Sequence, residues 1–320
     1  TTVLSAVDTQ HSDTIHDTQL DYYGRRLATC SSDATVRIFD VSGESQQLLQ
    51  ELKGHDGPVW QVAWAHPKFG GYIASCSYDH RVLIWREVNK GQWQLEHEHR
   101  LHEASVNSLA WAPHEYGLVL ACASSDNYIS IVCKTNESWE GQRFFGHLVG
   151  CTAVSWAPPM PSQQAATNAP GVEGAAAAGG GGAADSQGAQ YHRLLASGGC
   201  DNAVHICRWR EDGSWQKVEE LSEHKDWVRD VAFCPSLGLP TLTLASCSQD
   251  GTVRIWTSVS GGSWSSSTLP SFNFPVWRLS WSVTGSILAV ACGDGGVYLW
   301  KAVAGGQWEQ VSKLSEESSQ

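Results

Sequence analysis

The sequence predicts an all-β fold made of six repeated units, each with four short strands. Three observations predict it. One segment of about 13 residues, centred on an Asp, recurs six times at similar intervals. Sixteen Trp against a single Met indicate that Trp stands at fixed places in a repeated unit. The 31 Gly supply the tight turns that many short strands need.

The two middle strands of each unit lie on either side of the recurring Asp. The second unit reads Ile73-Ala-Ser-Cys-Ser-Tyr-Asp79-His-Arg-Val-Leu-Ile-Trp85, and the fifth repeats it closely from Leu244 to Trp256. Alternating apolar and β-branched residues on each side of a turn are typical of two antiparallel strands. The equivalent aspartates are Asp33, Asp79, Asp126, Asp201, Asp250 and Asp294.

An upstream run and a downstream run complete each unit. Upstream, apolar residues flank a small one, as in Val62-Ala-Trp64 and Leu279-Ser-Trp281, and Pro or Gly follows within a few residues in most units. Downstream, turn residues precede a Trp, as in Gly91-Gln-Trp93 and Gly262-Ser-Trp264. These runs predict a first and a fourth strand, so each unit holds four.

One unit carries an insertion. The aspartates are 46, 47, 75, 49 and 44 residues apart, so the third interval is longer by about 29 residues. The extra residues lie at 159–190 and include the run from Ala175 to Gly182, Ala-Ala-Ala-Ala-Gly-Gly-Gly-Gly. Such a composition cannot bury enough apolar surface to offset its ordering entropy. We expect a disordered Ala/Gly-rich surface loop within the fourth unit.

Composition and charge exclude several classes of protein. The formal charge of −12 argues against binding nucleic acid or anionic lipid through the overall field. No run of 18 apolar residues and no signal-peptide pattern occurs, so we expect a soluble intracellular chain without membrane insertion. The ten Cys lie mostly within small-residue strands, which predicts free, buried thiols rather than disulfides.

A His precedes most units, and its distance to the turn Asp is 24 residues in both the second and the third. Together with the Trp that ends the third strand, this pattern resembles the WD-repeat family. The resemblance implies a single β-propeller domain over residues 1–320, with six four-stranded blades. It also implies a hydrogen-bonded structural set of His55, Ser75, Asp79 and Trp85 in the second unit. Matching positions are His102, Asp126, His147, Asp201, His224, Asp250 and Trp256. The sixth unit lacks the His.

The two ends of the chain together hold one strand more than six four-stranded units need. The last unit has its own fourth-strand candidate at 307–314, and residues 315–320 read as a flexible tail. Residues 1–8 then hold a surplus strand formed by Val3, Leu4, Ser5, Ala6 and Val7. An unpaired strand is a template for another chain. We therefore expect an open ring in which this seam strand forms a seventh blade with a partner. The alternative is that residues 3–7 close a plain six-bladed ring.

Longer stretches carry a more specific resemblance. The opening from Val7 to Asp33, the run from Gly54 to Gly70 and the phrase from His102 to Pro113 are similar to a family of small WD-repeat subunits. That family is shared by the COPII outer coat and the Y-shaped complex of the nuclear pore. The resemblance implies a non-enzymatic scaffold in ER-to-Golgi transport. It would be completed in trans by a large helical rod protein of the coat, or by a large helical nucleoporin.

The same resemblance implies a location that is cytoplasmic, peripheral on the ER membrane and on COPII vesicles, and at the nuclear pore. A second function stays open: a WD-repeat adaptor that closes its own ring and binds short peptides on its top face. A hydrolase triad is disfavoured because the His–Asp set recurs in several units. A metal site at His97, His99 and His102 lacks a dedicated ligand spacing. No phosphate-binding Gly motif is present. We expect no catalytic residue, cofactor or metal.

Overall fold

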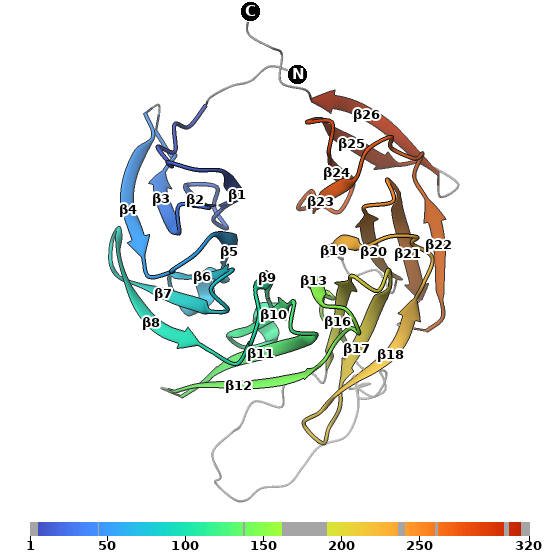
Figure 1. The fold of residues 1–320 in the computed structure, drawn as a ribbon, viewed down its shortest axis with the longest axis horizontal. Helices are drawn as coiled ribbons and strands as arrows, with labels where there is room; N and C mark the ends of the chain where they lie inside the picture. The colour runs from blue at the N-terminus through green and yellow to red at the C-terminus, as the bar shows by residue number, and fades with distance from the viewer. Residues whose placement is uncertain are drawn as a thin grey trace, which may run out of the picture.

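The computed structural model describes residues 6–43, 45–136, 138–161, 191–235, 241–259, 262–303 and 307–314. These residues form six four-stranded antiparallel sheets arranged as the blades of a propeller (Figure 1). The predicted all-β fold with six blades is therefore confirmed. In each blade the first strand lies at the central channel, and the strands follow outward in chain order.

The first three blades run from β1 to β12. Blade one comprises β1 (Ile15–Leu20), β2 (Arg26–Ser31), β3 (Thr35–Asp40) and β4 (Gln47–Lys53). Blade two comprises β5 (Val59–Trp64), β6 (Tyr72–Ser77), β7 (Val82–Asn89) and β8 (Gln92–His99). Blade three comprises β9 (Val106–Trp111), β10 (Val119–Ser124), β11 (Tyr128–Thr135) and β12 (Ser138–Phe145). Two short 3-10 helices, Pro67–Phe69 and His114–Tyr116, follow β5 and β9.

The last three blades run from β13 to β26. Blade four comprises β13 (Cys151–Trp156), β16 (Leu194–Gly199), β17 (Val204–Trp209) and β18 (Trp215–Leu221). Blade five comprises β19 (Val228–Phe233), β20 (Thr241–Ser248), β21 (Val253–Val259) and β22 (Trp264–Thr268). Blade six comprises β23 (Val276–Trp281), β24 (Ile287–Cys292), β25 (Val297–Ala302) and β26 (Trp308–Leu314).

The insertion begins and ends in a small ladder. β14 (Met160–Pro161) pairs antiparallel with β15 (Tyr191–His192), between β13 and β16 of blade four. Residues 160 and 161 of the predicted loop at 159–190 thus pair with the two residues that follow it, and the disorder of the rest stays a prediction. Residues 162–190 lie outside the described part of the chain, as does the tail at 315–320.

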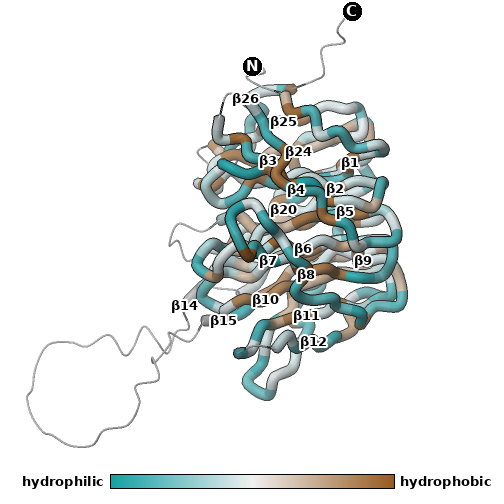
Figure 2. Tube along the Cα trace, turned by 90° about the vertical axis from the view of Figure 1, so that its left-hand side faces the viewer, coloured by the Kyte–Doolittle hydropathy of each residue, from teal (hydrophilic) through white to brown (hydrophobic). Residues whose placement is uncertain are grey.

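The core lies between the blades. The middle strands of an interior blade are covered on both faces: all six residues of β6 are buried, and so are all six of β16. Hydrophobic residues recur along the strands of successive blades, while the turns are largely hydrophilic (Figure 2). All ten Cys are free thiols, seven of them buried and three partly exposed. None of the described helices is long and apolar enough to span a membrane.

Candidate partner-binding seam

The second blade brings together the four residues predicted as a hydrogen-bonded set. His55 Nδ1 lies 2.9 Å from Asp79 Oδ2, and His55 Nε2 lies 2.9 Å from Ser75 Oγ. Trp85 Nε1 donates to the same Ser75 oxygen at 3.1 Å. The set ties the loop before β5 to β6 and β7. Ser75 is fully buried, and its hydroxyl is held on both sides, so no substrate reaches it as a nucleophile.

The other blades vary this set. The His Nδ1 to Asp oxygen distances are 2.9 Å for His102–Asp126, 2.8 Å for His147–Asp201 and 3.5 Å for His224–Asp250. In blade five, Trp256 Nε1 donates to Ser246 Oγ at 2.8 Å, and His224 Nε2 lies 2.7 Å from the same oxygen. In blade three, Cys122 replaces the strand Ser, and Ser130 of β11 supplies the hydroxyl to His102 at 2.8 Å.

Sequence reasoning missed one His. His11 Nδ1 lies 2.8 Å from Asp33 Oδ2, and its Nε2 lies 2.8 Å from Thr29 Oγ1, so blade one has the His, hydroxyl and Asp of the set, with Phe39 at the Trp position. The signal was present, because His11 stands 22 residues before Asp33, close to the interval of 24 in the next two units. Blade six has no such His: Asp294 instead accepts from Tyr298, Lys313 and the backbone N–H of Gly296.

Protonation in these sets follows from burial and hydrogen bonding. Burial raises the pKa of Asp201, but bonds from His147 and from the backbone N–H of Leu148 outweigh it and bring the pKa to about 2. Burial lowers the pKa of His224 to about 4, against the opposing effect of Asp250. The carboxylates are thus charged at neutral pH, and His224 is neutral. A neutral imidazole bridging a carboxylate and a hydroxyl is a structural clamp.

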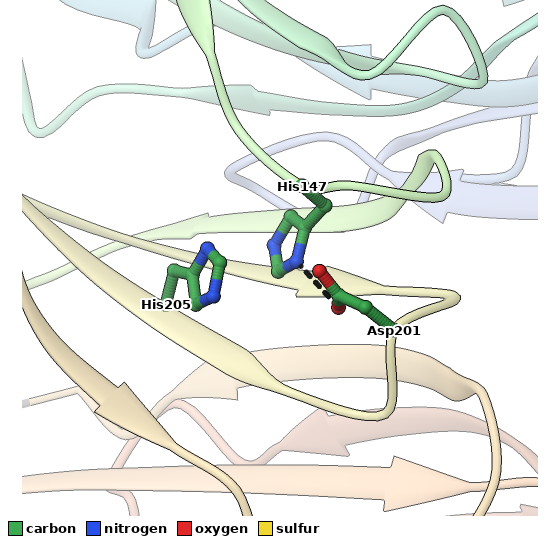
Figure 3. A group of neighbouring side chains, drawn as sticks. All are labelled: His147, Asp201 and His205. Atoms are coloured by element: carbon green, nitrogen blue, oxygen red, sulfur yellow. Dashed lines mark hydrogen bonds and ion pairs between the residues drawn. The ribbon is translucent and has the colours of Figure 1, made fainter.

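Blade four holds a tighter cluster, drawn in Figure 3. The rings of His147 and His205 stack with centroids 4.0 Å apart and 5° between their planes, beside Asp201. His147 uses both ring nitrogens, toward Asp201 and toward Ser197. His205 Nδ1 donates to the carbonyl of Gly146 at 2.8 Å. Although the three residues could hold a metal ion by proximity, the bonds to His147 leave its ring no lone pair to offer.

The three His residues that the sequence analysis considered as a metal site lie close together, but each has other contacts. His97 and His99 have ring centroids 6.4 Å apart, and His99 and His102 have centroids 6.0 Å apart. Ser130 Oγ lies within 2.9 Å of a ring nitrogen of both His99 and His102. Burial lowers the pKa of His99 to about 3. His99 therefore joins the clamp of blade three through Ser130, whereas His97 stacks on Trp139 with ring centroids 5.5 Å apart.

Hydrogen bonds link each inner strand from β5 to β23 to the preceding one. In blade five Phe233 stands at the Trp position, and its backbone N–H donates to Ser155 Oγ of β13 at 3.0 Å. The other four blades use the Trp that ends the strand. An indole N–H donates to the preceding inner strand: Trp64 to Gln19 O at 2.9 Å, Trp111 to Ala63 O at 3.0 Å, and Trp281 to Ala232 O at 3.0 Å. Trp156 does the same toward Ala110, at 2.9 Å. The matching residue of β1 is Leu20, whose side chain is 57% exposed. Blade one therefore makes no such bond toward blade six.

The polar bonds between inner strands end at the same place. Asp17 accepts from the backbone N–H of Val62 at 3.2 Å, and Asp230 accepts from that of Leu279 at 2.8 Å. The matching residue of blade six is Arg278, a donor, which contacts the carbonyl of Trp60 across the channel at 3.5 Å. Adjacent inner strands pack together from β1 through to β23, but β23 and β1 do not pack in this way within the described residues (Figure 1).

In the part of the chain that the structure describes, no blade packs against two of the blade faces; we call the space between them the seam. On blade two, the face toward blade three carries five buried apolar residues. The matching face of blade six is only partly buried. The residues of that blade-six face are Ile287, Ala289, Ala291, Val297 and Leu299, which match Tyr72, Ala74, Cys76, Val82 and Ile84. Blade one exposes Ile15 by 40%, whereas the matching Val59 is fully buried.

The predicted seam strand falls mostly outside the described residues. Val3, Leu4 and Ser5 are not described, while Ala6 and Val7 are described and belong to no strand. The surplus strand therefore stays a prediction. Among the described residues, each of the six blades draws its four strands from one continuous stretch of the chain, and no strand from one terminus joins the blade of the other.

Comparison with known proteins agrees with this architecture. The family model described as WD domain, G-beta repeat matches residues 3–40, 46–86, 93–132, 215–257 and 264–301. The chain is 51% identical to the Protein SEC13 homolog of Homo sapiens, over 91% of this chain and 87% of that protein. It is 47% identical to the Protein SEC13 homolog of Dictyostelium discoideum, over 90% of each. It is 46% identical to the Protein transport protein SEC13 of Yarrowia lipolytica, over 91% of this chain and 92% of that protein. The chain belongs to the SEC13 family of WD-repeat proteins.

Proposed function

We propose that this protein is a non-enzymatic scaffold whose seam receives a seventh blade from a partner chain. The observation that carries the proposal is the uncovered apolar face of blade six. Soluble proteins rarely leave a contiguous apolar surface open unless something binds there. In blade two the same five positions are covered by blade three. The uncovered face of blade six therefore matches the surface of another blade.

The seam also indicates what the inserted element must offer. One of its faces must be apolar, to cover Ile287, Ala289 and Leu299. Its inner strand would supply a donor near Ser280, because Ser280 stands where Ala63 and Ala232 accept an indole N–H from the next blade. Its other face would meet Ile15 and Leu27 of blade one. A three-stranded sheet joined by the surplus strand at residues 3–7 meets these needs without leaving a bare edge.

The partners we propose are a large helical rod protein of the COPII outer coat and a large helical nucleoporin of the Y-shaped complex. A rigid propeller bound through an inserted blade would stiffen the end of such a rod. Relatives named as protein transport proteins favour a role in transport. Under this proposal the protein acts in ER-to-Golgi traffic, peripheral on the ER membrane and its vesicles, and at the nuclear pore.

The experiment is affinity purification followed by mass spectrometry, with variants that change only the seam. Leu299→Asp puts a charge on the uncovered face, where the isolated chain already meets solvent, so the fold should survive. Val259→Asp is the matched control, because Val259 is 67% exposed on blade five. A third version lacks residues 1–8. Circular dichroism and thermal melting check that each variant is folded.

We expect the wild type and Val259→Asp to bring down large helical partners in stoichiometric amounts. Leu299→Asp and the shortened chain should lose or weaken them, because a buried unpaired carboxylate and a missing strand both oppose insertion. If all four versions emerge alone and monodisperse, the ring closes in cis. The function would then be that of an adaptor that reads short peptides, and the scaffold would be abandoned.

A further inference from the structure

One residue of each inner strand, directly after its β-bulge, belongs to a layer around the central channel. In four blades this side chain accepts a hydrogen bond from a backbone N–H of the next inner strand. The four acceptors are Asp17, Gln61, Ser108 and Asp230. Arg278 holds the position in blade six, and a guanidinium has five N–H groups but no acceptor. The layer therefore changes from acceptors to a donor at the blade that borders the seam.

The neighbours of Arg278 lie on both sides of the seam. Its Nη2 donates to the carbonyl of Trp60 in blade two at 3.5 Å. Arg278 also lines a channel cavity of about 410 Å³ together with Asp17 of blade one and Asp230 of blade five. It lines a second channel cavity, of about 510 Å³, together with His16 of blade one. A side chain from one side of the seam thus lies among residues of the other side.

Two carboxylates and one guanidinium are the charged groups of the described residues that line the first cavity. Burial would lower the pKa of Arg278, but Asp230 and Asp17 outweigh it and raise the pKa. Burial raises the pKa of Asp17, and Arg278 opposes the rise. Burial also raises the pKa of Asp230 to about 6, so this carboxylate is largely charged at pH 7.5. The guanidinium therefore attracts two like charges that would otherwise repel each other.

Packing does not join the two sides of the seam in the way that it joins the other blades. Neighbouring inner strands pack together from β1 to β23, but β23 and β1 do not within the described residues. A ring that is open at one place can change its width through small rotations at every blade interface. An attraction between charges that spans the channel opposes such a change.

We propose that Arg278 links blade six to blade one across the channel and holds the seam at one width while no other chain fills it. Its guanidinium attracts Asp17 from the far side, and its bond to the carbonyl of Trp60 ties the same side chain to blade two. A seam that already has the right width costs an entering sheet less ordering. The inference concerns the chain by itself and does not depend on which partner enters the seam.

The test is double electron–electron resonance on the isolated full-length chain at pH 7.5. Spin labels are attached to non-natural amino acids, because the chain has ten free Cys of its own. The seam pair is Tyr23 and Val283, which lie in the turns after β1 and β23 and are 64% and 90% exposed. The control pair is Val88 of blade two and Val259 of blade five, two exposed positions on blades that are joined by continuous packing.

Four variants separate the link from a general loss of charge. Arg278→Gln removes the guanidinium, and Asp17→Asn removes the charge that attracts it across the channel. Asp230→Asn is the matched control for Asp17→Asn: both keep a side-chain oxygen for the backbone N–H, but Asp230 lies on the same side of the seam as Arg278. Arg210→Gln is the control for Arg278→Gln, because Arg210 is exposed in the turn before β18 and bonds Gln216. Melting temperatures show whether each variant is folded.

We expect one narrow distance for the seam pair in the wild type, Arg210→Gln and Asp230→Asn. Arg278→Gln and Asp17→Asn should lengthen that distance by about 2 Å or more and broaden its distribution, while the distance of the control pair stays unchanged. The proposal is overturned if Arg278→Gln keeps the wild-type distance, or if Asp17→Asn and Asp230→Asn give the same distance. If Arg278→Gln does not fold, the comparison of Asp17→Asn with Asp230→Asn decides.

Discussion

Substitution of Asp79 by Ala tests whether the His–Asp sets stabilise the propeller. The Asp79 carboxylate accepts from His55 Nδ1 at 2.9 Å, and from the backbone N–H groups of Asp56 and Arg81 at 2.9 and 3.0 Å. Two further bonds come from the Arg81 guanidinium, at 3.1 and 2.8 Å. The substitution removes the acceptor for all five donors but leaves the packing of the strands unchanged.

The loss of unfolding free energy in Asp79→Ala depends on which of the five donors can bond water once the carboxylate is removed. The backbone N–H of Asp56 is near the surface, and Arg81 keeps Glu98 and Asp56 as partners. The His55 side chain is 2% exposed, so its Nδ1–H stays buried and unpaired. One orphaned buried donor and the loss of charge-assisted bonds together cost about 2–4 kcal/mol. With about 2.1 cal/mol/K per residue of unfolding entropy over 320 residues, the melting temperature should fall by about 3–6 °C.

The assay is differential scanning calorimetry of the wild type, Asp79→Ala and the control Asp212→Ala. Among the described residues, the Asp212 carboxylate accepts from the backbone N–H and the hydroxyl of Ser214 in an exposed turn, so its loss should move the melting temperature by about 1 °C or less. If Asp79→Ala and Asp212→Ala have the same melting temperature, the five bonds to Asp79 add no stability beyond that of hydrogen bonds to water. The reading of these sets as structural clamps would then be refuted.

The same comparison has a defined pH dependence. Burial raises the pKa of Asp79, but the bonds from His55 and the backbone outweigh it and hold the pKa well below its ordinary 3.8. Stability from a lowered carboxylate pKa is complete above the unfolded value and is lost as the pH falls toward the folded one. The difference in melting temperature between wild type and Asp79→Ala should therefore narrow from pH 7 to pH 3. A constant difference would contradict the assignment.

Two further predictions concern buried positions. A Cβ on Gly199 would collide with the ring of His147, so Gly199→Ala should destabilise by about 1–3 kcal/mol in thermal melts, whereas Gly43→Ala, with no atom nearer than 3.8 Å, should not. Equal melting temperatures for the two would show that blade four repacks freely. Burial raises the pKa of Asp230 to about 6, against the opposing charge of Arg278. Stability tied to a raised carboxylate pKa is lost as the pH rises through it. Asp230→Asn should thus gain melting temperature relative to wild type between pH 5 and pH 7.5, and a parallel change in both proteins would contradict this.

Much of the fold was predictable because the signals are local and repeated. Strand patterns, turn residues and the interval from His55 to Asp79 recur within single units, and each unit must make the same hydrogen bonds. The clamps varied where the local signal was weaker. His11 stands 22 residues before its Asp, against 24 in the next two units. In blade three the hydroxyl comes from Ser130 of β11, because Cys122 of β10 stands where blade two has Ser75. Such an exchange depends on which side chains meet across a sheet, and spacing along the chain does not record it.

Spacing along the sequence did not predict which residues of different blades meet in space. Each inner strand carries one extra residue at a β-bulge. These six residues differ in type, so no motif joins them, and only the closing of the strands around one channel brings Trp60 and Trp277 into one cavity. The stack of His147 and His205 likewise depends on tertiary packing.

The sequence by itself determined the number of blades, the four strands of each and the residues of most clamps, because repeated hydrogen-bonding needs leave a repeated pattern. Only the tertiary structure decided which apolar faces are covered. Ala289 and Leu299 of blade six resemble Ala74 and Ile84 of blade two in the chain, yet the first pair is partly exposed and the second is buried. Burial depends on what lies opposite a face, and within the described residues no blade packs against this face of blade six.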